Sequence, residues 1–174
     1  MLVALDASHG GKDPGAVGKN GLKESHVNLA VSNKARDAFK KAGIDVLMLR
    51  PDDVFVAISK RVEIANRAKA DYLVSVHCNA VKDRAAHGTE TFRYDRKDIP
   101  LANSLQLNLI KQLARRDRGV KQGQFLIIRA AKMPAALVEL AFISNIEEEK
   151  LLGDPKFQQL AAKAIVDGVM KVSN

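Results

Sequence analysis

The sequence predicts a single α/β domain built around a largely parallel sheet that is flanked by helices. Short apolar runs of strand character alternate along the chain with longer segments of helical periodicity, which is typical of α/β domains. The 174 residues are 47% hydrophobic and 28% charged, which suits one compact core and argues against disorder. We find no internal repeat, low-complexity tract or linker, so residues 1–174 are expected to form one domain.

The apolar runs place the expected strands, and helical periodicity separates them. Strands are expected near residues 2–6, 45–49, 71–77, 88–94, 125–129 and 135–139. The segment after Glu24 repeats apolar residues at helical spacing and stops at Gly43. Further helices are expected over 56–69, over 100–115, from the capping-box pattern Ser144-Asn145-Ile146-Glu147 to Gly153, and from Asp154-Pro155 onward.

The sequence has neither a transmembrane segment nor a signal peptide by the usual patterns. No apolar run approaches the ~20 residues that span a bilayer, so we expect no transmembrane segment. Met1 leads straight into the first strand, without the basic start and cleavable apolar stretch of a signal peptide. We therefore expect a chain that is cytosolic, exported by another device, or an excerpt from a longer precursor.

The charge is strongly basic, with a formal net charge of +8 and a pI near 9.7. Such a field favours a polyanion, which could be nucleic acid, a membrane surface or an anionic cell-wall polymer, although a solvated face is the simpler alternative. Aromatic residues make up only 5% and Trp is missing, so a platform for stacking bases is poorly supplied.

Four residues are hard to explain by structure alone: His9, Glu24, His77 and Glu139. His9 follows an apolar run and opens a glycine-rich turn, while His77 and Glu139 each end an apolar run. Glu24 lies only about 20° from Val31 on the helical wheel, on the face that should point inward. Two imidazoles and a carboxylate can bind zinc and leave one position for water, and a further carboxylate can serve as base. The combination indicates a hydrolase whose site lies at one edge of the sheet.

Each of the four also has a structural alternative. Glu24 could satisfy first-turn amides and the positive end of the helix dipole. Glu139 could form an ion pair with one of the many arginines. His9 could be a turn histidine bonded to backbone, and His77 a satisfied histidine at a strand end.

Three further residues are expected to lie outside the site. The single Cys78 excludes an internal disulfide and a thiolate zinc cluster, and next to His77 in a strand it should face the opposite side of the sheet and be buried. His26 lies about 200° around the helix from Glu24 and should face solvent. His87 lies in a polar loop and is also expected to be exposed.

Separated motifs cover the chain from the first strand to the last helix. They are Leu5-Asp6-Ala7-Ser8-His9-Gly10-Gly11-Lys12-Asp13-Pro14-Gly15-Ala16; Gly21-Leu22-Lys23-Glu24 with Val27-Asn28-Leu29; Arg61 with Ala65-Asn66; Ser75-Val76-His77-Cys78-Asn79-Ala80; Arg118-Gly119-Val120-Lys121; and Met133-Pro134-Ala135-Ala136-Leu137-Val138-Glu139-Leu140-Ala141-Phe142-Ile143-Ser144-Asn145. In this order they resemble the zinc-dependent N-acetylmuramoyl-L-alanine amidases of the family often called amidase type 3.

The resemblance implies the family's fold, a three-layer α/β sandwich with a mixed, mostly parallel central sheet flanked by helices. It places one zinc ion, with a bound water as nucleophile, on His9, Glu24 and His77, and the catalytic glutamate on Glu139. The implied reaction is hydrolysis of the amide between the lactyl group of N-acetylmuramic acid and L-alanine in peptidoglycan. Such an enzyme would remodel or lyse the cell wall, as autolysins and endolysins do.

Some departures from the family pattern are visible. Ala7-Ser8 stands where relatives commonly have Pro-Gly before the histidine, and Cys78 where a small residue is usual. Some relatives carry an inhibitory helical insert between the second histidine motif and the next strand. Only a short loop separates His77 from Gly88 here, so the domain is expected to be constitutively open.

The resemblance also sets the expected location and partners. The site would act outside the cytoplasm, in the extracellular space or cell wall, after secretion within a longer precursor or release at lysis. We expect a monomer that acts on peptidoglycan, with anionic wall polymers attracted to its basic surface and nucleic acid excluded. The alternatives are a zinc peptidase that cuts within the peptide stem, a wall-binding module without catalysis, and a nucleic-acid binder.

Overall fold

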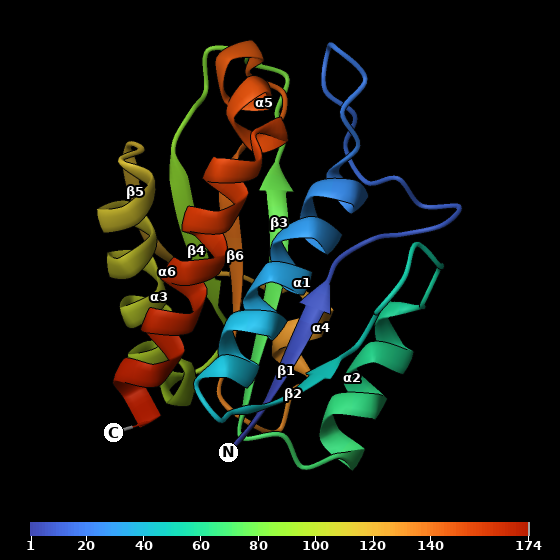
Figure 1. The fold of residues 1–174 in the computed structure, drawn as a ribbon, viewed down its shortest axis with the longest axis vertical. Coiled ribbons are helices and arrows are strands. Elements are labelled where there is room, and N and C mark those ends of the chain that lie inside the picture. Colours follow the sequence, from blue (N-terminus) through green and yellow to red (C-terminus); the bar gives the residue numbers. More distant parts are fainter. Residues whose placement is uncertain (174) are drawn as a thin grey trace.

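The structure, a computed structural model, describes residues 1–173 and forms one six-stranded sheet between two layers of helices (Figure 1). The strands are β1 (Leu2–Ala7), β2 (Asp45–Met48), β3 (Tyr72–Asn79), β4 (Thr89–Arg93), β5 (Asp117–Gln122) and β6 (Ala135–Phe142). The helices are α1 (Glu24–Lys41), α2 (Ile58–Arg67), α3 (Ile99–Leu113), α4 (Leu126–Arg129), α5 (Ile146–Gly153) and α6 (Pro155–Ser173), with a 3₁₀ turn, Arg96–Asp98, before α3.

The strands run in the order β2-β1-β3-β6-β4-β5. β4 is antiparallel to β6, and the other neighbouring pairs are parallel. This arrangement confirms the predicted single α/β sandwich with a mixed, mostly parallel sheet.

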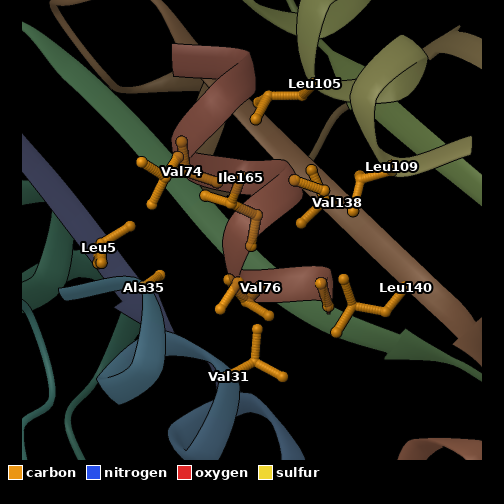
Figure 2. Packing of buried hydrophobic residues seen from close by; sticks show 14 of the residues in the cluster. Leu5, Val31, Ala35, Val74, Val76, Leu105, Leu109, Val138, Leu140 and Ile165 are labelled. Atoms are coloured by element: carbon orange, nitrogen blue, oxygen red, sulfur yellow. The ribbon is translucent and has the colours of Figure 1, made fainter. Parts of the chain in front are cut away.

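Alternation along the strands divides the core between the two faces of the sheet. On one face Val76 and Val138 pack against α1, α3 and α6, and Figure 2 shows Leu105 of α3 and Ile165 of α6 among these side chains. On the opposite face a smaller cluster that includes Leu137 packs against α2 and α4. The two apolar clusters therefore fix a helical layer on each side.

Helix α1 begins at Glu24, as predicted, and buries Val27, Val31 and Phe39 against the sheet. It ends at Lys41, just before Gly43, whose φ of 73° is the left-handed conformation that terminates many helices. The predicted inward position of Glu24 is confirmed, because its side chain is buried with the apolar face of the helix.

The strand predicted over 125–129 is wrong, because residues 126–129 form α4 and Phe125 is its N-cap. Ile127 and Ile128 of this short helix are buried against the sheet, and a short apolar run does not by itself distinguish a strand from a buried helix. The remaining strand is β5, a polar segment at the sheet edge that the apolar pattern did not reveal. Charged edge strands are common because they discourage pairing with other chains.

Two strands continue past their predicted ends. β3 extends to Asn79 and β6 to Phe142, so His77 and Glu139 lie within strands and not at their ends. The extensions form because the next residues, Cys78 and Leu140, point to the opposite face and are buried in the larger core cluster.

The capping box predicted for α5 is wrong by one residue. The N-cap is Asn145, whose side chain accepts hydrogen bonds from the amides of Glu147 and Glu148. The Ser144 hydroxyl instead accepts a hydrogen bond from an amide of the loop after β3. The predicted end at Gly153 is confirmed.

Both ends of the described chain lie at the same end of the sheet, at the base of Figure 1. The hydroxyl of Tyr72, at the start of β3, donates to the carbonyl of Val172 near the end of α6 at 3.1 Å. Among the helices of residues 1–173, none combines the length and apolar character needed to cross a membrane.

The contact between α3 and α6 gives a stability prediction. Leu105 is fully buried against Gly168, whereas Leu107 on the same helix is 58% exposed. Leu105→Ala should lower the free energy of unfolding by about 2–5 kcal/mol through lost burial and a new cavity, and Leu107→Ala by less than about 0.5 kcal/mol. Urea denaturation of both variants measures the difference, and equal losses would contradict the packing described.

Candidate metal centre and active site

The structure brings His9, Glu24 and His77 together at the end of the sheet toward which β1 and β3 point. His9 lies in the turn after β1, Glu24 is the first residue of α1, and His77 lies in β3. One potential ligand atom from each of the three lies within 4.8 Å of the other two. Segments far apart in the sequence thus direct two imidazole nitrogens and one carboxylate oxygen to a common point.

Glu24 lies between the two imidazoles. Its Oε1 is 3.1 Å from Nδ1 of His77 and 3.4 Å from Nε2 of His9. Ligands bound tetrahedrally to zinc at ~2.0–2.1 Å are about 3.3 Å apart, so these separations fit neighbouring positions around one ion. The amides of Ala16 and Cys78 donate to Oε2 and Oε1 at 2.9 and 3.1 Å and fix the carboxylate. The residues therefore fit zinc in both donor type and spacing.

The three side chains shift one another's pKa. Burial opposes the charged form of Glu24, but hydrogen bonds from His77 and His9 hold its pKa well below the usual range. Burial alone would lower the pKa of His9, but Glu24 and Asp13 outweigh it and raise the pKa to about 9. The pKa of His77 is also raised, because its hydrogen bond to Glu24 outweighs burial. Zinc binds the neutral imidazole, so metal and protons compete for this site.

Two buried guanidinium groups hold the turn that carries His9. The backbone of His9 has a left-handed φ of 63°, which is unfavourable for a residue other than glycine. Arg50 donates to the carbonyls of Ala7 and Ser8 at 2.7 and 3.3 Å, and Arg61 donates to the carbonyl of His9 at 2.6 Å. These hydrogen bonds stabilise the conformation that directs the imidazole toward Glu24.

The same turn supplies a carboxylate that orients His9. Asp13 Oδ2 lies 2.8 Å from Nδ1 of His9, which leaves Nε2 facing Glu24. A carboxylate on the far ring nitrogen fixes the tautomer and orientation of a metal-binding histidine. Gly15 completes the turn with a φ of 66°, and an added Cβ would lie 2.7 Å from Oε2 of Glu24 and 2.8 Å from the His9 ring. Only glycine fits this position.

Glu139 lies directly opposite His77 in the register of β3 and β6 and lines the same cavity. Its Oε2 is buried and has no hydrogen-bond partner among residues 1–173. Burial raises the pKa of Glu139 to about 7; His77 opposes this rise, while Glu24 and Glu90 add to it. An unpartnered buried carboxylate oxygen is costly. One that titrates near neutrality is suited to proton transfer.

The ion pair with an arginine that was considered for Glu139 is formed instead by Glu90, its neighbour on β4. Glu90 lies opposite Glu139 in β4 and accepts hydrogen bonds from Nε of Arg118 at 2.8 Å and Nζ of Lys121 at 2.5 Å. Asn79 donates to its other oxygen at 2.6 Å. Two of the basic residues are thus paired within the fold and do not contribute freely to the surface charge.

The residues that support the site, Asp13, Glu90 and Arg50, were not predicted from the sequence. Asp13 had a signal, a carboxylate four residues after His9 in a glycine-rich turn. Glu90 had a weaker one, a carboxylate inside a predicted strand. Arg50 had none, because nothing in its position after a strand distinguishes a fully buried arginine from a surface one.

Cys78, His26 and His87 have the positions predicted for them. Cys78 is buried in the larger core cluster, on the face of β3 opposite His77. His26 and His87 are both exposed.

Fold and site together define this protein as a single-domain α/β sandwich with a candidate metal centre and a second, unpaired carboxylate beside it. The sequence pattern of the N-acetylmuramoyl-L-alanine amidase family, type 3, matches residues 3–171. The chain belongs to this family.

Individual relatives agree with the family match. The uncharacterized protein YqiI of Bacillus subtilis is 43% identical over 96% of this chain and 82% of its own length. The N-acetylmuramoyl-L-alanine amidase LytC of Bacillus subtilis is 36% identical over 97% of this chain, which spans 34% of LytC. The catalytic domain of CwlV, an N-acetylmuramoyl-L-alanine amidase from Bacillus (Paenibacillus) polymyxa var. colistinus, superimposes with a TM-score of 0.97 at 35% identity. That superposition covers 99% of this chain and 98% of the chain of the CwlV catalytic domain.

The role of Asp13 can be tested through zinc affinity. Asp13→Ala should weaken zinc binding about 10–100-fold, because the carboxylate no longer orients His9. Glu24→Ala should weaken it further by removing a donor. Asp83→Ala, which removes an exposed loop carboxylate, serves as the control. Competition with a chromogenic chelator measures the affinities, and an unchanged value for Asp13→Ala would contradict the orienting role.

Proposed function

We propose that this protein is a zinc-dependent amidase that hydrolyses the amide bond between N-acetylmuramic acid and L-alanine in peptidoglycan. The observation that carries the proposal is the convergence of His9, Glu24 and His77 beside the unpaired carboxylate of Glu139. The names of the family and of LytC and CwlV give this amidase activity for those proteins, which supports the same reaction here.

His9, Glu24 and His77 would hold the ion. When bound, zinc lowers the pKa of a water molecule and polarises a carbonyl oxygen. Asp13 keeps Nε2 of His9 directed to the site, and Arg50 and the neighbouring guanidinium of Arg61 keep its backbone in place. The protein thereby presents its donors already oriented.

Glu139 would move the proton. Its carboxylate accepts a proton from the attacking water and then, as the acid, donates a proton to the nitrogen of the departing L-alanine. The unpartnered Oε2 is free to accept, and a pKa near 7 favours both steps. Glu90 is less suited, because Lys121 and Arg118 outweigh its burial and lower its pKa.

We further propose that the protein acts on the wall outside the cytoplasm, as a monomer. The net charge of +8 supports an attraction to anionic wall polymers, although Arg118 and Lys121 are paired. Residues 80–88 form a short loop without a helix. This supports a site that is open without activation.

Replacing the proton shuttle tests the mechanism. Glu139→Gln keeps the shape of the side chain but removes the proton acceptor, so turnover of purified peptidoglycan should fall about 10²–10⁴-fold. Zinc content by elemental analysis should stay unchanged. Glu147→Gln, at an exposed glutamate of α5, should retain full activity. An active Glu139→Gln enzyme would refute the assigned role.

The products identify the bond that is cut. Digestion of purified peptidoglycan should release lactyl carboxyl groups and new N-terminal L-alanine in equal amounts, as measured by mass spectrometry. A chelator should stop the reaction and added zinc should restore it. New ends within the peptide stem would instead show a peptidase, and zinc-loaded protein that releases nothing would show a binding module.

A further inference from the structure

Phe125 lies beside the candidate metal centre, where two recesses meet. The three metal donors and Glu139 all line a recess of about 320 Å³, so the scissile amide of a substrate must lie in this recess when it is cleaved. A second recess, of about 540 Å³, shares His9, His77 and Phe125 with the first. Both volumes fall in the size range of small-ligand sites. A substrate that extends from the metal donors into the second recess therefore passes Phe125.

The ring of Phe125 is exposed and yet held in one place. Phe125 is the N-cap residue of α4 and is 42% exposed. Its ring meets the ring of Phe92 edge to face, with the ring centroids 5.0 Å apart and the ring planes at 69°, which is a favoured arrangement of aromatic pairs. A large apolar side chain that is fixed in contact with solvent beside a reaction centre indicates a binding surface.

Gly123 leaves room for this ring. A Cβ added at Gly123 would lie 2.7 Å from two atoms of the Phe125 ring and 3.1 Å from Phe92. The amide of Gly123 donates to the carbonyl of Arg93, at the end of β4, at 2.8 Å and keeps this backbone against the sheet. Any other residue at this position would therefore displace the Phe125 ring from the place where the recesses meet.

The two phenylalanines supply the large apolar surface of the recess that holds the metal donors. The donors and Glu139 are polar, and Asn79 and Glu90 add two more polar side chains to the lining. Phe92 and Phe125 are the large apolar side chains there, and Phe125 is the more exposed of the two. An apolar group of a substrate bound at the metal donors is thus best accommodated against Phe125.

The bond that is cut in the proposed substrate has an apolar group on each side. The lactyl group and the L-alanyl residue each carry one methyl group next to the scissile amide. We propose that Phe125 contacts the substrate at the scissile amide and packs against a methyl group that flanks this bond. The assignment rests on the proposed function, and it holds whichever half of the substrate lies in the larger recess.

Two substrates that differ only in these methyl groups test the contact. The first is N-acetylmuramoyl-L-alanyl-D-isoglutamine, and in the second glycolyl replaces lactyl and glycine replaces alanine. Phe125→Ala should lower kcat/KM about tenfold on the first compound and less than about twofold on the second. Phe125→Leu keeps an apolar contact and should lose less on the first compound. Leu160→Ala, at an exposed residue of α6 that lines neither recess, should change neither rate.

A change at Gly123 tests the position of the ring without removing it. Gly123→Ala should reproduce part of the loss on the first compound, because the added Cβ displaces the Phe125 ring. Combined with Phe125→Ala, it should cause no further loss, since the ring it displaces is gone. Fully additive losses would overturn the role of the ring position. Unfolding curves verify that each variant is folded.

The remaining outcomes separate this contact from the reaction itself. Equal losses for Phe125→Ala on both compounds, or no loss on the first, would overturn the methyl contact. The loss of about tenfold is also expected on intact peptidoglycan, and an unchanged rate there would overturn the contact as well. Wild-type enzyme that cleaves neither the first compound nor intact peptidoglycan would instead overturn the proposed function.

Discussion

The carboxylate of Glu24 is the interaction on which the site depends. It is a buried charge, which is costly unless each oxygen finds partners. Its partners come from three segments: the imidazole of His9 after β1, the imidazole of His77 and the amide of Cys78 in β3, and the amide of Ala16 before α1. Displacing any one segment would leave the charge partly unpaired. The same contacts therefore hold these segments together and assemble the candidate metal donors.

Along β3 and β6, side chains that line the candidate site alternate with side chains that pack in the core. His77 and Glu139 face the open cavity, while their neighbours Cys78 and Leu140 face the main core. Groups mounted on buried central strands are held more rigidly than groups on loops. His9 is the exception, since it lies in a turn, and there Arg50 and the adjacent Arg61 hold the backbone.

Features that follow from hydrophobic periodicity could be predicted from the sequence, whereas features that depend on tertiary contacts could not. Glu24 was predictable because a carboxylate on the inward face of a helix breaks an apolar pattern. His77 was predictable because it ends the apolar run of a predicted strand. The helical conformation of α4, where a strand was predicted, could not be foreseen, because a short apolar run is compatible with both a strand and a buried helix. Arg50 is hidden for a different reason: its partners are backbone carbonyls of the His9 turn, which no side-chain pattern records.

Both ends of the described chain lie at the base of the sheet (Figure 1), whereas the candidate metal donors lie toward the opposite end, where β1 and β3 finish. A tether joined at either end would leave the mouth of the site unobstructed. The length and stiffness of the tether would then determine how far the domain can reach from its point of attachment, and how many cross-links lie within that reach. The position of the two ends would therefore allow this domain to be joined to another domain or anchor without covering its site.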